Sequence, residues 1–140
     1  MFLGEHQHTL DAKGRVILPS RFRERLANGL VFAPSQERCI DIYPSTVFER
    51  RIEGLQTIPH EDQRGRAFLR ILMAGAHEDR PDAQGRVTIP ARLRDYAHLE
   101  RDLTLNGMND KIELWDRGTW EAYRVQAEED FANLQTPFVL

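Results

Sequence analysis

The feature that most constrains the fold of this chain is a phrase that occurs twice. It reads LDAKGRVILPSRFRE over residues 10–24 and PDAQGRVTIPARLRD over residues 81–95. At an offset of 71 positions, residues 2–26 and 73–97 share ten identities in 25 positions, far more than unrelated segments would. Internal similarity at a fixed offset indicates a repeated structural unit. The fold must therefore accommodate two equivalent copies.

The repeat continues beyond the phrase, with its register shifted by one residue. At an offset of 72, residues 39–49 (CIDIYPSTVFE) align with residues 111–121 (KIELWDRGTWE). Each copy is thus a unit of about 45 residues. The predicted organisation is a first repeat, a helical linker, a second repeat and a C-terminal helix with a tail, over residues 5–47, 48–75, 76–119 and 120–140.

Each phrase contains a tight turn, DAKG in the first copy and DAQG in the second. Gly14 and Gly85 supply the positive φ that a tight hairpin turn requires. Asp11 and Asp82 stand at the entry of the turns, where a carboxylate can accept hydrogen bonds from the backbone beyond it. We expect these four residues to brace the two turns.

A short strand follows each turn, over residues 15–18 and 86–89. Side chains of a strand alternate between its two faces, so the valine and the next-but-one apolar residue of each strand share one face. The other face carries the arginine that follows the turn glycine, and its second position is isoleucine in one copy and threonine in the other. That face is therefore the wetter one, and we expect Arg15 and Arg86 to point toward solvent.

The remaining elements follow from periodicity and end signals. Pro19 and Pro90 suit the first turn of a helix, and Ser45 and Asp116 are candidate N-caps. Predicted helices cover residues 20–26, 46–55, 60–74, 91–96 and 117–134, and further strands cover residues 30–33, 40–43, 103–105 and 111–115. Neither copy is large enough to bury a good core alone. The sequence therefore predicts a mixed α+β, β-rich fold in which both copies form one pseudo-twofold β-barrel flanked by helices.

The net charge of −3 argues against generic, charge-driven binding to nucleic acid. Basic charge is nevertheless concentrated around the repeated phrase. Residues 11–25 hold five basic side chains against two acidic ones, and residues 80–94 hold four against one. Arginine outnumbers lysine 17 to 2, and arginine is the side chain best suited to bidentate recognition of phosphate or guanine.

Several function classes find no support. No apolar run approaches the ~20 residues of a membrane span, and the start MFLGEHQH does not resemble a secretory signal. The single cysteine, Cys39, is expected to be an inert buried thiol. His6 and His8 share one strand face, but nothing suggests a third metal ligand, so ordinary strand histidines are the favoured interpretation. The sequence has no nucleophile–base pair and no phosphate-binding glycine loop, so we expect that the chain is not an enzyme and binds no cofactor or small-molecule substrate. We also expect no membrane partner and a cytoplasmic location.

The aspartate and arginine of each phrase admit two interpretations from the residues alone. They can form an ion pair that only braces the turn, which would contribute about 0–1 kcal/mol if exposed. Alternatively, the arginines can contact nucleic acid. The spacing by itself does not decide between these alternatives.

The paired phrases resemble the doubled D-x-x-x-R signatures of the MraZ family, which are bacterial transcriptional regulators built from two tandem SpoVT-AbrB half-domains. The segments MFLGE at the start, GAHE before the second phrase and IELWD after it also resemble family positions. The similarity runs from residue 1 to about residue 128.

This resemblance implies a swapped-hairpin β-barrel, a ring-like homo-oligomer and sequence-specific binding to double-stranded DNA, with association to the nucleoid. It also implies a target, the direct repeats upstream of the division and cell-wall operon that the family's own gene heads. The alternative that we keep is an AbrB-like antitoxin, or another protein-binding module, which occupies its partner through a terminal tail.

The resemblance implies that the signature arginines contact DNA. Arg15 and Arg86 are expected to read base edges, while neighbouring basic side chains hold phosphates. These neighbours are Lys13, Arg21, Arg23, Arg92 and Arg94. Gln84 stands where the first copy has Lys13, so we expect the first turn to bind phosphate better than the second.

The predicted C-terminal helix carries an apolar stripe. Its members recur at helical spacing and are Trp120, Tyr123, Ala127, Phe131 and Leu134. We expect this stripe to be the inward side of the helix, with a partner-docking surface as the alternative. The apolar tail Phe138–Leu140 has no assigned role.

Overall fold

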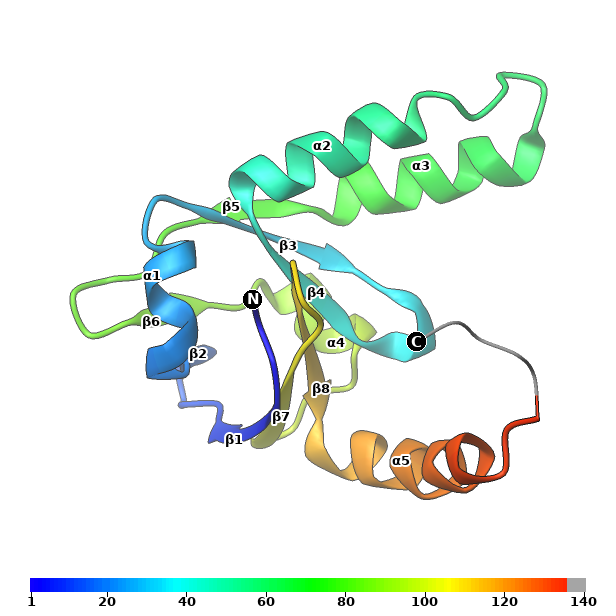
Figure 1. Ribbon diagram of the computed structural model, residues 1–140. Coiled ribbons are helices and arrows are strands. Elements are labelled where there is room, and N and C mark those ends of the chain that lie inside the picture. The colour runs from blue at the N-terminus through cyan, green and yellow to red at the C-terminus, as the bar shows by residue number, and fades with distance from the viewer. Residues whose placement is uncertain (136–140) are drawn as a thin grey trace.

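The computed structural model describes residues 1–135 and has a mixed α+β architecture with two antiparallel sheets (Figure 1). The strands are β1 (Glu5–Thr9), β2 (Arg15–Ile17), β3 (Leu30–Pro34), β4 (Ile40–Pro44), β5 (His77–Asp79), β6 (Arg86–Thr88), β7 (Asp102–Gly107) and β8 (Ile112–Asp116). The α-helices are α1 (Arg23–Leu26), α2 (Ser45–Leu55), α3 (Gln63–Gly75), α4 (Ala91–Tyr96) and α5 (Arg117–Ala132), with short 3-10 turns at Ser20–Phe22 and Gln36–Arg38.

The two copies exchange their first strands. The larger sheet has the order β1-β7-β8-β4-β3-β5, so β1 of the first copy pairs with β7 of the second, and β5 of the second pairs with β3 of the first. The smaller sheet is the ribbon formed by β2 and β6, one strand from each copy. The swapped-hairpin arrangement that the family resemblance implies is therefore confirmed.

A pseudo-twofold axis relates the copies, and the strand registers locate it. In the β2–β6 ribbon Val16 lies opposite Val87, which is its own counterpart at the offset of 71. In the larger sheet Asp41 of β4 lies opposite Glu113 of β8, its counterpart at the offset of 72. Equivalent residues meet only on a twofold axis, so the axis passes through both sheets.

The main core lies between the ribbon and the larger sheet. Val16 and Val87 are buried, whereas Ile17 on the other face of the ribbon is 46% exposed, as the alternation predicts. Burying one such aliphatic side chain contributes about 1.5–3 kcal/mol. The largest fully buried members of this core are Phe2, Phe22, Phe32, Leu18, Leu26, Leu30, Ile40, Ile42, Ile89, Leu103, Leu105 and Ile112.

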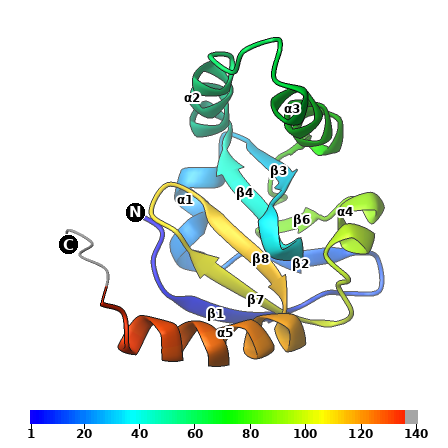
Figure 2. The same ribbon diagram turned by 90° about the vertical axis from the view of Figure 1, so that its right-hand side faces the viewer.

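Helices cover the outside of this assembly. The antiparallel pair α2 and α3 and the helix α5 all pack on the outer face of the larger sheet, the pair over the half that holds Tyr43 and α5 over the half that holds Trp115. The helices α1 and α4 stand on either side of the β2–β6 ribbon (Figure 2). A second small apolar cluster joins Val31 and Tyr43 of the sheet to Phe48 of α2 and Leu72 of α3. Within residues 1–135, no helix has the length and apolar character needed to cross a bilayer.

Of the two predicted N-caps, the structure confirms one and corrects the other. Asp116 caps α5, since its carboxylate accepts a hydrogen bond from Thr119 N at 3.3 Å, as predicted. Ser45 is not an N-cap: it is the first residue of α2, Pro44 occupies the cap position, and no side chain bonds the cap. Pro44 has a φ of −55° and an extended ψ of 141°, so the helical conformation begins at the next residue, Ser45.

The inward assignment of the C-terminal stripe is also wrong for most of its length. No residue of α5 is buried, and Tyr123 and Phe131 are 44% and 81% exposed. Only the first part of the helix packs on the sheet, where the rings of Trp120 and Tyr123 each lie 5.2 Å from the ring of Trp115 of β8, centre to centre. Beyond this contact α5 runs past the sheet, so the rest of its apolar stripe faces outward. The tail Phe138–Leu140 lies outside the described residues.

Candidate nucleic-acid interface

The first turn is organised by the carboxylate of Asp11. One of its oxygens accepts hydrogen bonds from the backbone N–H groups of Lys13 and Arg15 at 2.9 and 2.8 Å. The other accepts from Arg15 Nε at 2.8 Å. The backbone of Asp11 also bonds Arg15 O and Gly14 N, which closes the hairpin. The arginine is therefore held by its Nε, with the end of the guanidinium directed away from the turn.

The second turn repeats this geometry. Asp82 accepts from the backbone of Gln84 and Arg86 at 2.9 Å each, and from Arg86 Nε at 2.7 Å. In both turns the backbone N–H of the arginine is the largest cause that lowers the pKa of the aspartate, with the arginine side chain adding to it. Both carboxylates are thus ionised at neutral pH, and each offsets part of the positive charge of its arginine.

The two turns differ at the outer end of the guanidinium. Arg86 Nη2 donates to Gln84 Oε1 at 3.3 Å, whereas neither Nη atom of Arg15 has a hydrogen-bond partner among residues 1–135. Lys13, the counterpart of Gln84, is exposed and carries a charge of its own. The first turn therefore presents more free donors than the second.

The copies interlock through two further arginines. Arg94 of the second copy lies directly over Gly14 of the first, where an added Cβ would stand 1.8 Å from Arg94 Nη1. Arg23 of the first copy covers Gly85 in the same way, at 2.5 Å from Nε. Both glycines have positive φ, 78° and 79°, so conformation and space each require glycine.

The basic residues predicted to hold phosphate thus fall into two groups. Arg23 Nε donates to Leu18 O at 3.0 Å and Arg94 Nη1 to Ile89 O at 2.8 Å, so part of each guanidinium is committed to the protein. Arg21, Arg92 and Lys13 are exposed and form no ion pair within residues 1–135. Their donors are free for an external anion. Sequence spacing could not separate the groups, because the distinction depends on which guanidinium folds back onto a carbonyl five residues earlier in its own copy.

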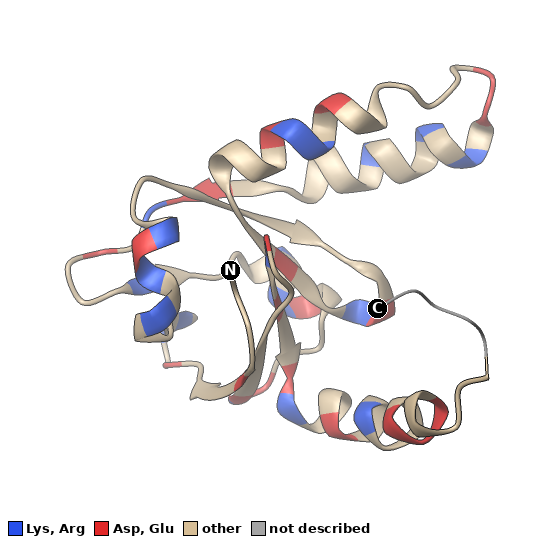
Figure 3. Cartoon of the chain, in the orientation of Figure 1, with Lys and Arg blue, Asp and Glu red and all other residues tan. Residues whose placement is uncertain are grey.

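Basic side chains lie around the β2–β6 ribbon. In Figure 3, Lys and Arg positions lie on α1 and beside β2 and β6, at the left, with acidic positions among them, and further basic positions lie on α2 and α3, while α5 mixes both signs. By sequence, residues 11–25 hold five basic side chains against two acidic ones, and residues 80–94 hold four against one. Arg25 of α1 belongs to this side, but its guanidinium stacks 4.3 Å from the ring centre of Phe2 and donates to Asn109 O. The surface beside the two turns is therefore locally basic on a chain of net charge −3.

His6 and His8 lie on β1, next to Phe22 and Ile17 of the first copy, whereas Cys39 adjoins β4 of the larger sheet. His6 Nε2 is 3.1 Å from Leu3 O and its ring packs edge-on against Phe22. Burial is the largest cause that lowers the pKa of His8. Burial likewise raises the pKa of the Cys39 thiol to about 12, with Glu113 and Asp41 adding to the shift. Sequence reasoning missed that these two acids meet Cys39, although the alignment at offset 72 already paired their positions.

Comparison with known proteins agrees with the doubled architecture. Residues 1–71 and 72–139 each match the family described as "MraZ protein, putative antitoxin-like". Proteins named transcriptional regulator MraZ from Salinispora arenicola and Frankia casuarinae are each 47% identical to this chain, over 96% of it and over 95% and 94% of their own lengths. The protein of that name from Thermobifida fusca is 46% identical over the same shares, 96% and 94%. The chain therefore belongs to the MraZ family, as its doubled turns with their aspartate–arginine pairs indicate.

Proposed function

We propose that this chain is a sequence-specific DNA-binding transcriptional regulator, and that it acts on the promoter of its own division and cell-wall operon. The observation that carries the proposal is the pair of aspartate-braced turns, which present Arg15 and Arg86 at equivalent positions about a pseudo-twofold axis. The names of the relatives support the regulatory role. Family membership also agrees with the prediction that the chain is not an enzyme.

The turn arginines are proposed to read base edges in the major groove. Arg15, fixed through Nε, keeps both Nη groups for O6 and N7 of guanine, whereas Arg86 must first release Gln84 Oε1 from its Nη2. A good bidentate contact of this kind contributes about 1–3 kcal/mol of discrimination. Because Asp11 and Asp82 hold their arginines in place, less side-chain entropy is lost when DNA binds. The two turns with their glycines are therefore proposed as a prearranged reading element.

Phosphate contacts are assigned to the exposed basic side chains. Lys13, Arg21 and Arg92 have free donors beside the turns, so we propose that they set the register on the backbone. Arg23 and Arg94 are proposed to contact phosphate only with the donors that the protein leaves free. The first turn has Lys13 and an Arg15 guanidinium whose Nη atoms have no partner among residues 1–135, so we propose that it contributes more to DNA affinity than the second turn.

A single chain with so few free cations should bind DNA weakly, so we propose that a ring-like homo-oligomer places several ribbons on direct repeats. Linked binding sites raise affinity through effective concentration. The exposed apolar side chains at the end of the α5 stripe support self-association, since Phe131 and Leu134 would otherwise leave apolar surface in water. A cytoplasmic, nucleoid-associated location goes with this function.

The test is a gel-shift titration on DNA from upstream of the chain's own gene, at two salt concentrations. We expect Arg15→Ala to weaken binding more than Arg86→Ala, and the double variant to lose preference for that DNA over scrambled sequence. Lys13→Ala is expected to weaken binding to both sequences and to reduce its salt dependence. Binding should also be stronger per chain on an array of repeats than on one repeat.

Arg70→Ala is the matched control, because Arg70 is an exposed arginine on α3, away from the ribbon, and its loss changes the net charge equally. This variant should bind like the unmodified protein. If the double variant of Arg15 and Arg86 retained full selectivity, the assignment of base reading to the turns would be wrong. If one repeat and an array bound equally per chain, the oligomer proposal would fail.

The antitoxin-like function stays a second candidate because the matched family description contains that term. It would require a partner bound through the C-terminal region. The regular helix α5 through Ala132 differs from the unstructured tail that such binding uses. Co-purification of a small basic protein that is lost when residues 133–140 are removed would favour this candidate.

A further inference from the structure

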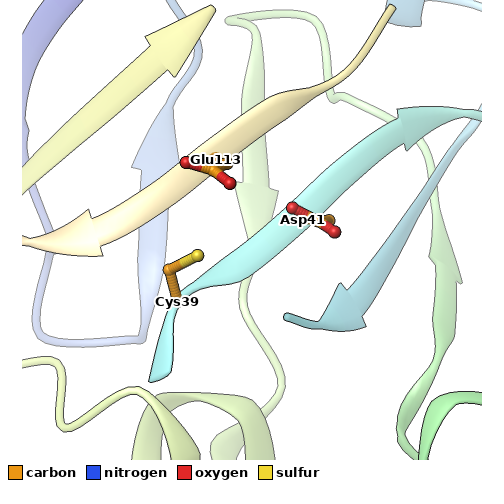
Figure 4. A group of neighbouring side chains, drawn as sticks. All are labelled: Cys39, Asp41 and Glu113. Carbon is orange, nitrogen blue, oxygen red and sulfur yellow. The ribbon is translucent and has the colours of Figure 1, made fainter. Parts of the chain in front are cut away.

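A cluster of three metal-ligating side chains lies where the two copies meet in the larger sheet. Asp41 of β4 faces Glu113 of β8 across the strand pair, and Cys39 precedes Asp41 by two residues, so all three share one face. One potential ligand atom from each residue, the Cys39 Sγ and one oxygen from each carboxylate, lies within 4.8 Å of the other two. Figure 4 shows the three side chains converging from the two strands.

One oxygen of this cluster lacks a hydrogen-bond partner. Asp41 is only 4% exposed. Its Oδ2 accepts from Tyr43 Oη and from Lys111 Nζ, both at 3.1 Å, but Oδ1 has no partner within residues 1–135. Buried polar atoms are nearly always bonded, so an exception of this kind indicates an absent ligand or an absent proton. In Figure 4 the Asp41 carboxylate has one oxygen on the side of Glu113 and Cys39 and the other on the far side.

The two copies differ in the side chain that lies next to each of these carboxylates. The repeat alignment places Lys111 at the position equivalent to Cys39. Lys111 supplies a cation to Asp41 on one side of the axis, whereas on the other side Glu113 has a thiol as its neighbour and only a 3.3 Å hydrogen bond from Trp115 Nε1. Two carboxylates therefore share one ammonium group, and buried charges need compensation.

We propose that Cys39 Sγ, Asp41 Oδ1 and a carboxylate oxygen of Glu113 form a Zn²⁺ site that ties β4 to β8. Zinc accepts sulfur and oxygen ligands together, in tetrahedral sites whose fourth position a water can fill. A thiolate ligand selects against Mg²⁺ and Ca²⁺, which prefer oxygen alone. On binding, the thiol releases its proton to solvent and the sulfur lone pair bonds the metal, with no change of oxidation state.

The surroundings allow this step once the Cys39 thiol gives up its hydrogen bond to Gln36 O, at 3.3 Å. Lys111 can stay on Oδ2 while the metal occupies the opposite oxygen, and Trp115 bonds only one oxygen of Glu113. A surface cleft of about 500 Å³ reaches Glu113 and Lys111 and offers an entry path. The zinc would link the two copies directly, since Cys39 and Asp41 belong to the first and Glu113 to the second.

The experiment measures zinc binding by the full chain after treatment with a chelator, by competition with a chromophoric indicator. We expect one zinc per chain, with Cys39→Ala and Glu113→Gln each losing about tenfold or more in affinity, because even indirect partners of a metal site cost this much. Zinc should raise the Tm of the unmodified protein and not that of the variants. Cobalt should give sulfur-to-metal charge-transfer absorption, which is lost in Cys39→Ala.

Glu53→Gln is the matched control, because Glu53 is an exposed carboxylate of α2 with no bonded partner among the described side chains. Its zinc affinity should be unchanged, and far-ultraviolet circular dichroism of each variant verifies that it folds. If the unmodified chain binds no zinc, or if zinc binds equally to Cys39→Ala and Glu113→Gln, the site is refuted.

Discussion

Replacing Gly14 with alanine is expected to lower the free energy of unfolding by about 2–4 kcal/mol. Gly14 has a φ of 78°, and a left-handed conformation costs a residue with a side chain about 1–2 kcal/mol. The new Cβ would also stand 1.8 Å from Arg94 Nη1 and displace it from Ile89 O, to which it donates at 2.8 Å. Because Arg94 is half-buried and water replaces part of the bond, this loss adds about 1–2 kcal/mol.

A double-mutant cycle separates the two contributions. In an Arg94→Ala background the displaced bond is already absent, so Gly14→Ala should cost only about 1–2 kcal/mol, the conformational part. Gly85→Ala should behave like Gly14→Ala, because its Cβ would stand 2.5 Å from Arg23 Nε. The assay is urea unfolding followed by circular dichroism at a fixed protein concentration, since self-association would shift apparent stability.

Gly54→Ala is the control glycine. It lies in the exposed part of α2, and an added Cβ would meet nothing within 4 Å. Alanine should therefore stabilise the chain by up to about 1 kcal/mol through its helix propensity. The reasoning is refuted if the free energy of unfolding of Gly14→Ala lies within about 0.5 kcal/mol of that of the unmodified protein. It is also refuted if Gly14→Ala lowers that free energy by the same amount in the Arg94→Ala background.

Three further outcomes are expected. The folded turns lower the pKa of Asp11 and Asp82 from 3.8, so the stabilisation that these carboxylates provide is present above that pH and lost as pH falls through the lower folded value. The double variant Asp11→Asn with Asp82→Asn should therefore be less stable than the unmodified protein at pH 6, and this difference should shrink below pH 3.8 in urea titrations. With its pKa raised to about 12, Cys39 should resist alkylation at pH 8 until the protein is unfolded, as mass spectrometry would record. Asp116→Ala should remove the cap of α5 and cost about 0.5–2 kcal/mol, seen as faster amide exchange in its first turn.

Local chemistry made much of the fold predictable. The turns, the strands that follow them and the cap at Asp116 depend on residues within four positions of one another, and the structure has them as expected. The pseudo-twofold barrel also followed from the sequence, because two copies that are each too small for a core must share one. Ser45 was misassigned because α2 begins one residue earlier than its apolar periodicity predicts, which leaves Pro44 at the cap position.

The stripe of α5 shows where periodicity reaches its limit. Helical spacing predicts that one side of a helix is apolar, but it does not say what that side contacts. Trp120 meets Trp115 at the sheet, while Phe131 extends past it and is 81% exposed. Phe131 is exposed because the sheet ends before the helix does. The length of the sheet cannot be read from the sequence pattern of α5.

By itself, the sequence determined that the chain is doubled, that glycine and aspartate shape each turn, and that an arginine leaves each turn on the wetter face. Only the tertiary structure decided that Arg23 and Arg94 cover the other copy's turn glycine, and that Cys39, Asp41 and Glu113 meet. The physical reason is strand register: these contacts join segments some 70 positions apart, and a shift of one residue would turn every side chain to the opposite face.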